Sequence, residues 1–173
     1  MNHFRSTSRR VAALFFGLTV LAATMPSAYA LGPGQSLPTA SVTGTDANAV
    51  PLVDGKARAT YIDFWASWCG PCRHSFPWMN RMQQKFGAQG LRIVAINLDA
   101  KRADAKDFLA QVPANFDLAY DSHGEAARKF GLATMPSSVL VDADGKVIAV
   151  HQGFRDEDES ALEARIAAAL GHQ

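Results

Sequence analysis

The stretch that decides the fold is Ala59-Thr-Tyr-Ile-Asp-Phe-Trp-Ala66-Ser-Trp-Cys69-Gly70-Pro71-Cys72. Its first eight residues are almost all apolar or β-favouring, which is typical of a strand buried on both faces. Beyond Cys72, apolar residues recur at helical spacing as far as Phe86, Pro71 suits a first helical turn, and Gly87 follows. The stretch therefore predicts a buried strand at 59–66 that leads into a helix at 71–86, with both cysteines at the junction.

The chemistry is expected at Cys69 and Cys72, the only two cysteines of the chain. Unpaired N–H groups and the positive end of the helix dipole favour a thiolate at Cys69, and the thiolate is the species that attacks a disulfide. Cys72, about one turn further along, is more shielded and suits the resolving role. A structural disulfide would close too short a loop to stabilise the fold much, and a zinc site lacks further cysteines. We therefore expect a redox-active disulfide, with no metal and no other cofactor.

Further strand and helix signals alternate along the rest of the chain. Residues 31–51 are rich in Gly, Pro, Ser and Thr and predict a lead-in with at most a short hairpin. Asp142-Ala-Asp-Gly145 is a strong hairpin signal. The pattern predicts an α/β fold, with a mixed sheet and helices on both faces. The expected strands are 91–98, 116–120, 138–141 and 147–150, and the expected helices are 104–112, 125–130 and one that carries Leu162, Ile166 and Leu170.

Residues 1–30 have the three-part layout of a secretory signal peptide. Three arginines precede an apolar run at 11–25, and Ala28-Tyr29-Ala30 closes it with small residues. Fifteen residues fall short of the roughly twenty that span a bilayer, although an uncleaved membrane anchor remains an alternative. Cleavage after Ala30 would leave one domain at 31–173, without stable membrane insertion, in the periplasm or another extracytoplasmic space.

Composition limits the class of protein. The chain has 173 residues, of which 48% are hydrophobic and 19% charged, with a net charge of +1. Loss of residues 1–30 would remove three arginines and no acid, so that the net charge becomes −2. Such a chain is neither disordered nor a basic nucleic-acid binder. We expect a monomer, and we expect His74, His123, His151 and His172 to lie at the surface.

The segment Phe64-Trp-Ala-Ser-Trp-Cys-Gly-Pro-Cys72 resembles the active site of the thioredoxin superfamily. With the leader, Phe76-Pro77, Met135-Pro136-Ser-Ser138 and the turn at 142–145, the chain resembles the exported TlpA/ResA-like thiol:disulfide oxidoreductases of bacteria. The resemblance extends from about Gly34 to the C-terminus. It implies a thioredoxin fold with an N-terminal hairpin extension and a central β–α insertion at about residues 98–121.

The resemblance also assigns roles to individual residues. Cys69 would be the nucleophile and Cys72 the resolving thiol. Pro136 would be a cis-proline that faces the disulfide, and Met135 would offer its backbone to an extended substrate strand. Trp68, Gly70 and Pro71 would complete the substrate-binding surface, with Trp68 partly exposed as a docking point.

Asp63 lies six residues before Cys69 in an otherwise apolar strand. Burial penalises a carboxylate, so its pKa should rise and it could shuttle a proton to Cys72. The alternative is an aspartate satisfied by local hydrogen bonds. Thioredoxins have an acid at this place. ResA-like reductases have a glutamate three residues after the second cysteine, where this chain has Ser75.

The leading functional hypothesis is an exported protein that reduces disulfides in specific client proteins. The resemblance implies cytochrome c maturation as a typical task of such a reductant. The pair Gly70-Pro71 matches thioredoxin, whose potential is about −270 mV. A reductant in an oxidising compartment requires recharging, so a membrane thiol electron donor is implied. The alternatives are a disulfide oxidase or isomerase, a copper-handling protein that binds Cu(I) through both thiolates, and a thiol peroxidase.

Overall fold

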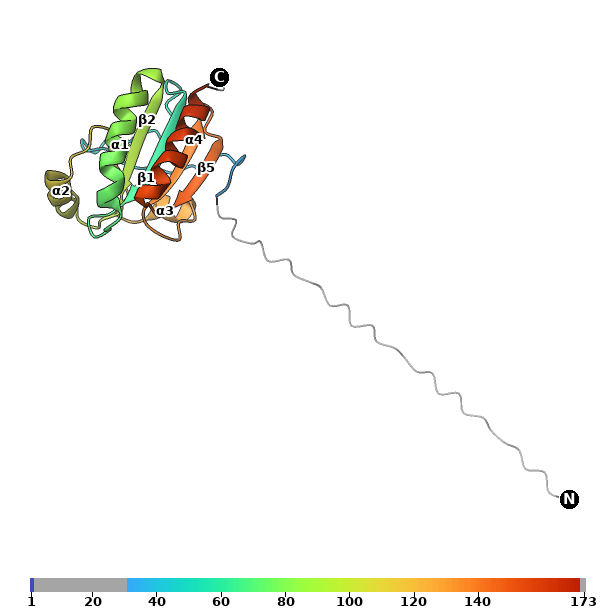
Figure 1. The fold of residues 1–173 in the computed structure, drawn as a ribbon. Helices are drawn as coiled ribbons and strands as arrows, with labels where there is room; N and C mark the ends of the chain where they lie inside the picture. Colours follow the sequence, from blue (N-terminus) through green and yellow to red (C-terminus); the bar gives the residue numbers. More distant parts are fainter. Residues whose placement is uncertain (2–30, 172–173) are drawn as a thin grey trace.

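The computed structural model describes Met1 and residues 31–171, so the expected signal peptide lies outside the described residues except for Met1. A five-stranded sheet forms the centre of the fold, in the order β3-β2-β1-β4-β5 (Figure 1). β1, β2 and β3 are parallel, whereas β4 runs antiparallel to both β1 and β5, which confirms the mixed sheet. The strands are β1 Ala59–Trp65, β2 Leu91–Asn97, β3 Asp117–Tyr120, β4 Ser137–Asp142 and β5 Val147–Gln152.

Helices cover both faces of the sheet. α1 and α4 lie side by side across one face (Figure 1), where their apolar residues join those of β1 and β2 in a single core cluster. α3 and the N-terminal segment contribute to a second cluster on the opposite face. The helices are α1 Cys72–Phe86, α2 Arg102–Gln111, α3 Glu125–Lys129 and α4 Glu159–Gly171, with short 3-10 turns η1 Gly87–Gln89 and η2 Asp156–Asp158.

The central strand β1 divides its side chains strictly between the two clusters. Tyr61 and Trp65 pack on the α1/α4 face, and Ile62 and Phe64 pack on the α3 face. Every residue of β1 is buried, as the nearly continuous apolar pattern predicts. Asp63 lies two residues from both Tyr61 and Trp65. Since every second side chain of a strand points to the same face, its carboxyl lies on the α1/α4 face.

The helix after the cysteine pair begins one residue later than expected. Its first i→i−4 hydrogen bond runs from the Ser75 N–H to the Pro71 carbonyl at 3.2 Å, so Pro71 is the residue before the helix and Cys72 is the first helical residue. The central insertion at 98–121 contains α2 followed by β3, so the helix precedes the strand.

The N-terminal extension closes the short hairpin that the sequence predicts. Thr43 and Ala49 form an antiparallel bridge, and the Val50 N–H donates to the Val42 carbonyl at 3.0 Å. The hairpin is held to the sheet by two further bridges, from Ser36 to Lys146 and from Thr43 to Tyr120. In the second of these, the Thr43 N–H donates to the Tyr120 carbonyl and the Tyr120 N–H donates to the Thr43 carbonyl. Among the described residues, no helix is long and apolar enough to cross a bilayer.

Candidate active site

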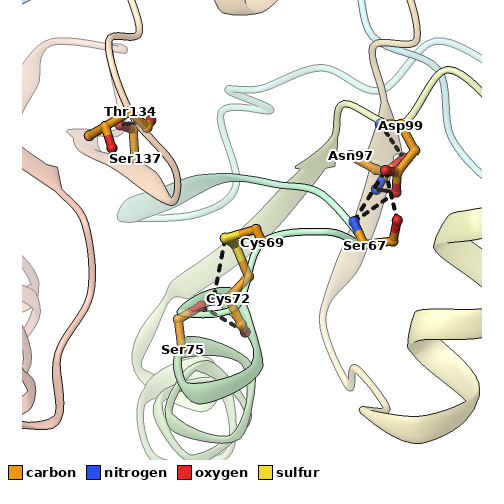
Figure 2. The surroundings of a disulfide bond; sticks show 8 residues. All are labelled: Ser67, Cys69, Cys72, Ser75, Asn97, Asp99, Thr134 and Ser137. Carbon is orange, nitrogen blue, oxygen red and sulfur yellow. Dashed lines mark hydrogen bonds between the residues drawn. A yellow bond between two sulfur atoms is a disulfide. The ribbon is translucent and has the colours of Figure 1, made fainter.

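Cys69 and Cys72 form a disulfide at the junction of β1 and α1, with their Cα atoms 5.4 Å apart (Figure 2). Cys72 is the first residue of α1 and is completely buried, while Cys69 lies in the preceding loop and is 4% exposed. The backbone N–H of Cys72 donates to the Cys69 Sγ at 3.3 Å. A hydrogen bond to the charged form of a thiol favours that form. The geometry therefore supports Cys69 as the attacking thiolate and Cys72 as the shielded partner.

An open groove of about 540 Å³ lies beside the disulfide. Trp68, Cys69, Gly70, Pro71 and Met135 line it, together with Leu98, Ala127, Leu132, Ala133 and Thr134. The indole of Trp68 is 72% exposed, which agrees with a docking role. Four of the five expected substrate-binding residues thus line the groove together with Cys69, whereas Cys72 does not line it.

Pro136, the fifth expected binding residue, does not line this groove. The Met135–Pro136 peptide bond is cis. Pro136 is buried, and its carbonyl accepts a hydrogen bond from the Gly153 N–H at 2.7 Å. Met135, which is half-buried, is therefore the residue of this pair that lines the groove.

Asp63 is a buried carboxyl on the same face of the sheet as α1. It is 2% exposed, and its Oδ2 has no hydrogen-bond partner among the described residues. Burial raises the pKa of Asp63 well above its usual range. The interpretation of Asp63 as an aspartate satisfied by local hydrogen bonds does not hold for this oxygen. The raised pKa instead suits the carboxyl to taking up and giving back a proton.

A second buried carboxylate, Asp99, was not singled out by the sequence. Figure 2 shows it at the end of β2, next to the loop that carries the cysteines. Its oxygens accept the Ser67 N–H and the Ser67 hydroxyl, each at 2.9 Å, and the Asn97 amide at 2.7 Å. Asp99 therefore ties the loop just before Trp68 to the neighbouring strand. The sequence does contain a signal that could have identified Asp99, namely two polar residues, Asn97 and Asp99, at the end of an apolar strand.

Ser75 occupies the position where ResA-like reductases have a glutamate. It is buried, and its hydroxyl donates to the Cys72 carbonyl at 3.2 Å (Figure 2). The side chain thus closes a local hydrogen bond within α1 and supplies no ionisable group to the disulfide.

The described histidines divide between exposed and half-buried positions. His74 and His123 are exposed as expected, with His74 Nδ1 3.5 Å from Asp156. His172 lies outside the described residues. His151 departs from the expectation, because its side chain is only 23% exposed. It lies on β5, and η2 brings Asp158 to within 3.5 Å of its Nε2. In residues 31–171, no group of three His, Cys, Asp or Glu side chains could hold a metal ion.

A thioredoxin fold with a disulfide between its first strand and first helix defines a class of protein, the thiol:disulfide oxidoreductases of the thioredoxin superfamily. The chain belongs to the Redoxin family, whose model matches residues 32–166. Within the superfamily it is TlpA/ResA-like, as the following relatives show.

Curated relatives carry the description thiol-disulfide oxidoreductase ResA. The protein from Bacillus thuringiensis subsp. konkukian is 32% identical over 126 residues, which cover 73% of each chain. The protein from Bacillus subtilis is 26% identical over 82% of this chain and 79% of its own. A crystal structure described as a DsbE thiol:disulfide interchange protein from Chlorobium tepidum is 52% identical. It covers 82% of this chain and 99% of its own, with a TM-score of 0.78. The chain is accordingly a protein-disulfide oxidoreductase.

Proposed function

We propose that the chain is an extracytoplasmic reductase of client-protein disulfides, which cycles between the Cys69–Cys72 disulfide and the dithiol. The observation that carries the proposal is the position of Cys69. Its sulfur accepts the Cys72 N–H and borders an open groove next to the exposed Trp68. A client disulfide can approach this sulfur, whereas Cys72 is closed off inside α1.

The reaction balances two electrons and two protons. The Cys69 thiolate attacks one sulfur of the client disulfide, and the other client sulfur leaves as a thiolate that takes a proton from solvent. Asp63, when ionised, takes the proton of Cys72. The Cys72 thiolate then attacks Cys69 Sγ and displaces the second client thiolate, which also becomes protonated. The client gains two electrons, and the chain is left with its disulfide.

The direction of the reaction rests on the two residues between the cysteines. Gly70-Pro71 matches thioredoxin, a reductant of about −270 mV, rather than oxidants at about −120 mV. Since a reductant outside the cytosol must be recharged, the partners are client proteins with disulfides and a membrane thiol electron donor. The secretory layout of residues 1–30 supports an extracytoplasmic location. We propose that the clients are proteins of cytochrome c maturation, which requires reduced haem-site cysteines. The proposed reductase acts as a monomer without metal or other cofactor.

The deciding experiment is the reduction potential of the full chain, measured by tryptophan fluorescence in thiol/disulfide buffers. For this two-electron couple, about 30 mV corresponds to about 1.4 kcal/mol, so the candidate functions are well separated. A potential at or below about −250 mV supports the reductase. A potential above about −160 mV would instead make the chain an oxidase or isomerase.

Two further assays address the remaining alternatives. Titration of the reduced chain with Cu(I) should give no stoichiometric binding stronger than that of small dithiols, and peroxide should be consumed no faster than by free thiols. A tight copper complex or rapid peroxide turnover would replace the reductase with a copper-handling protein or a thiol peroxidase.

A further inference from the structure

A row of polar side chains crosses the sheet from the buried carboxyl to the edge strand. Asp63 on β1 lies directly opposite Ser138 on β4, and Ser138 lies directly opposite His151 on β5. Residues opposite each other on neighbouring antiparallel strands point to the same face, with Cβ atoms roughly 5 Å apart. The three side chains therefore stand next to one another on the α1/α4 face, in an otherwise apolar layer.

Each end of this row carries a buried polar atom that makes no hydrogen bond, although Asp158 lies 3.5 Å from the one on His151. Asp63 Oδ2 and His151 Nε2 are both buried without a hydrogen-bond partner, and the other two such atoms in the described part of the chain are tryptophan nitrogens. Buried polar groups are usually paired, so unpaired ones call for an explanation. Two such atoms at the ends of one three-residue row indicate a shared role.

Ser138 connects the two ends. Its Oγ accepts the Tyr61 hydroxyl at 2.8 Å, so its own proton is left to donate. A cavity of about 10 Å³ lies among Tyr61, Ser138, His151 and Arg165, lined also by Leu140, Ala149, Leu162 and Ile166. This volume is close to the smallest that holds one water molecule. One water in this cavity can thus link the Ser138 hydroxyl to the imidazole. On the other side, the register places Ser138 directly opposite Asp63, within reach of a small movement of either side chain.

We propose that Ser138 and His151 conduct protons between Asp63 and the solvent at the β5 edge of the sheet. The inference rests on the proposed function, in which Asp63 takes the proton of Cys72. Burial raises the pKa of Asp63, and a proton that the carboxyl takes from Cys72 must leave before the carboxyl can accept another. α1, α4 and the sheet enclose Asp63, and the row through Ser138 offers an exit.

Two charged side chains from other elements lie around His151. Asp158 Oδ2 of η2 is 3.5 Å from Nε2, and Arg165 of α4 lines the same cavity. Burial raises the pKa of Tyr61, so this hydroxyl stays neutral throughout. The His151 side chain is 23% exposed, and it is the titratable side chain of the row that reaches solvent.

The test compares His151→Gln with His123→Gln in the full chain. His123 is exposed and has no place in the row, so it controls for the loss of a histidine. The rate at which Cys72 resolves the mixed disulfide between Cys69 and glutathione is followed by tryptophan fluorescence from pH 6 to pH 9. His151→Gln should slow this step about tenfold near pH 6.5, with the effect fading toward pH 9, where hydroxide takes the proton directly. The reduction potential should not change, because a relay alters the path of the proton and not the end states.

A second variant guards against misfolding of the first. Tyr61→Phe/Ser138→Ala removes both partners of the hydrogen bond, creates no new unpaired buried group, and should slow the same step. Asp63→Asn/His151→Gln should be no slower than Asp63→Asn alone, since both act on one path.

Two results would overturn the relay. One is a resolution rate of His151→Gln equal to that of His123→Gln at every pH, and the other is a slowing matched by a shift in potential. Failure of the proposed function would give a different result. In that case, Cys69→Ser would catalyse disulfide exchange at the same rate as the wild-type chain.

Discussion

The carboxylate of Asp99 accepts both the backbone N–H and the hydroxyl of Ser67, each at 2.9 Å. These bonds join the end of β2 to the loop between β1 and α1, two residues before Cys69 (Figure 2). Asp99 is 4% exposed and also holds the Asn97 amide. The loop that presents Trp68 and Cys69 is therefore fixed by a carboxylate that belongs to the neighbouring strand.

Asp99→Ala should lower the free energy of unfolding by about 2–3 kcal/mol, because it leaves the Ser67 N–H and the Asn97 amide without their charged acceptor. Urea unfolding of the oxidised protein measures this loss. Ser67→Ala is the matched control, since it removes only the hydroxyl donor and should cost about 1 kcal/mol. Equal losses in the two variants would mean that the carboxylate does not hold the loop.

Asp63→Asn should stabilise the oxidised protein at neutral pH and leave it unchanged near pH 3.5. Burial raises the folded-state pKa of Asp63 above its unfolded value. The carboxyl is neutral in both states at low pH, and the wild type loses stability as pH rises from the unfolded pKa, about 3.9, through the folded pKa. The gain at pH 7 should exceed about 1 kcal/mol.

Urea unfolding of wild type and Asp63→Asn at several pH values measures this difference. Asp104→Asn, a substitution of an exposed carboxyl in α2, is the control and should show no comparable trend. A stability difference for Asp63→Asn that is the same at pH 3.5 and pH 7 would contradict the raised pKa.

The sequence predicted those parts of the fold that local patterns determine. β1 and α1 follow from an apolar run and a helical repeat on either side of Cys69 and Cys72. The hairpin of β4 and β5 follows from the turn at 142–145, where the Gly145 N–H donates to the Asp142 carbonyl. The short N-terminal hairpin was predicted, but its attachment to the sheet was not, because the pairing of Thr43 with Tyr120 depends on where β3 ends in space.

Local sequence patterns could not predict the contacts between segments that are distant in the sequence. Ser67 and Asp99 are 32 residues apart, and the polar end of β2 gave no hint of which loop it would hold. His151 lies on an edge strand, where exposure was the natural expectation, but η2 folds across it and brings Asp158 alongside. Asp63 was singled out correctly as a buried acid, because a lone carboxyl in an apolar strand is visible in the sequence itself.

Alkylation of the reduced protein should modify Cys69 and spare Cys72. Cys69 borders the groove, and the N-terminal end of α1 favours its thiolate, while Cys72 is fully buried at the start of the helix. Iodoacetamide at pH 7 should add one carboxamidomethyl group, which peptide mass spectrometry assigns to a residue. Guanidinium-unfolded protein is the control and should gain two groups. Equal rates at the two cysteines under native conditions would reverse the assignment of nucleophile and resolving thiol.

Trp68→Ala should weaken reduction of protein disulfides while leaving the fold and the small-molecule reaction intact. The indole is 72% exposed at the rim of the groove, so its removal should change the free energy of unfolding by less than about 0.5 kcal/mol. Exposed aromatics at a contact surface often supply about 2 kcal/mol of binding energy, which corresponds to a rise in KM of roughly thirtyfold.

Insulin reduction and glutathione-disulfide reduction, measured side by side, separate this docking effect from the chemistry at Cys69. Ile148→Ala is the matched control, because Ile148 is the other large apolar side chain exposed in residues 31–171 and lies on β5. Its KM for insulin should stay at the wild-type value. If Trp68→Ala instead slows both substrates equally, the indole acts on the reactivity of Cys69, and the client must be held by the groove walls around Met135.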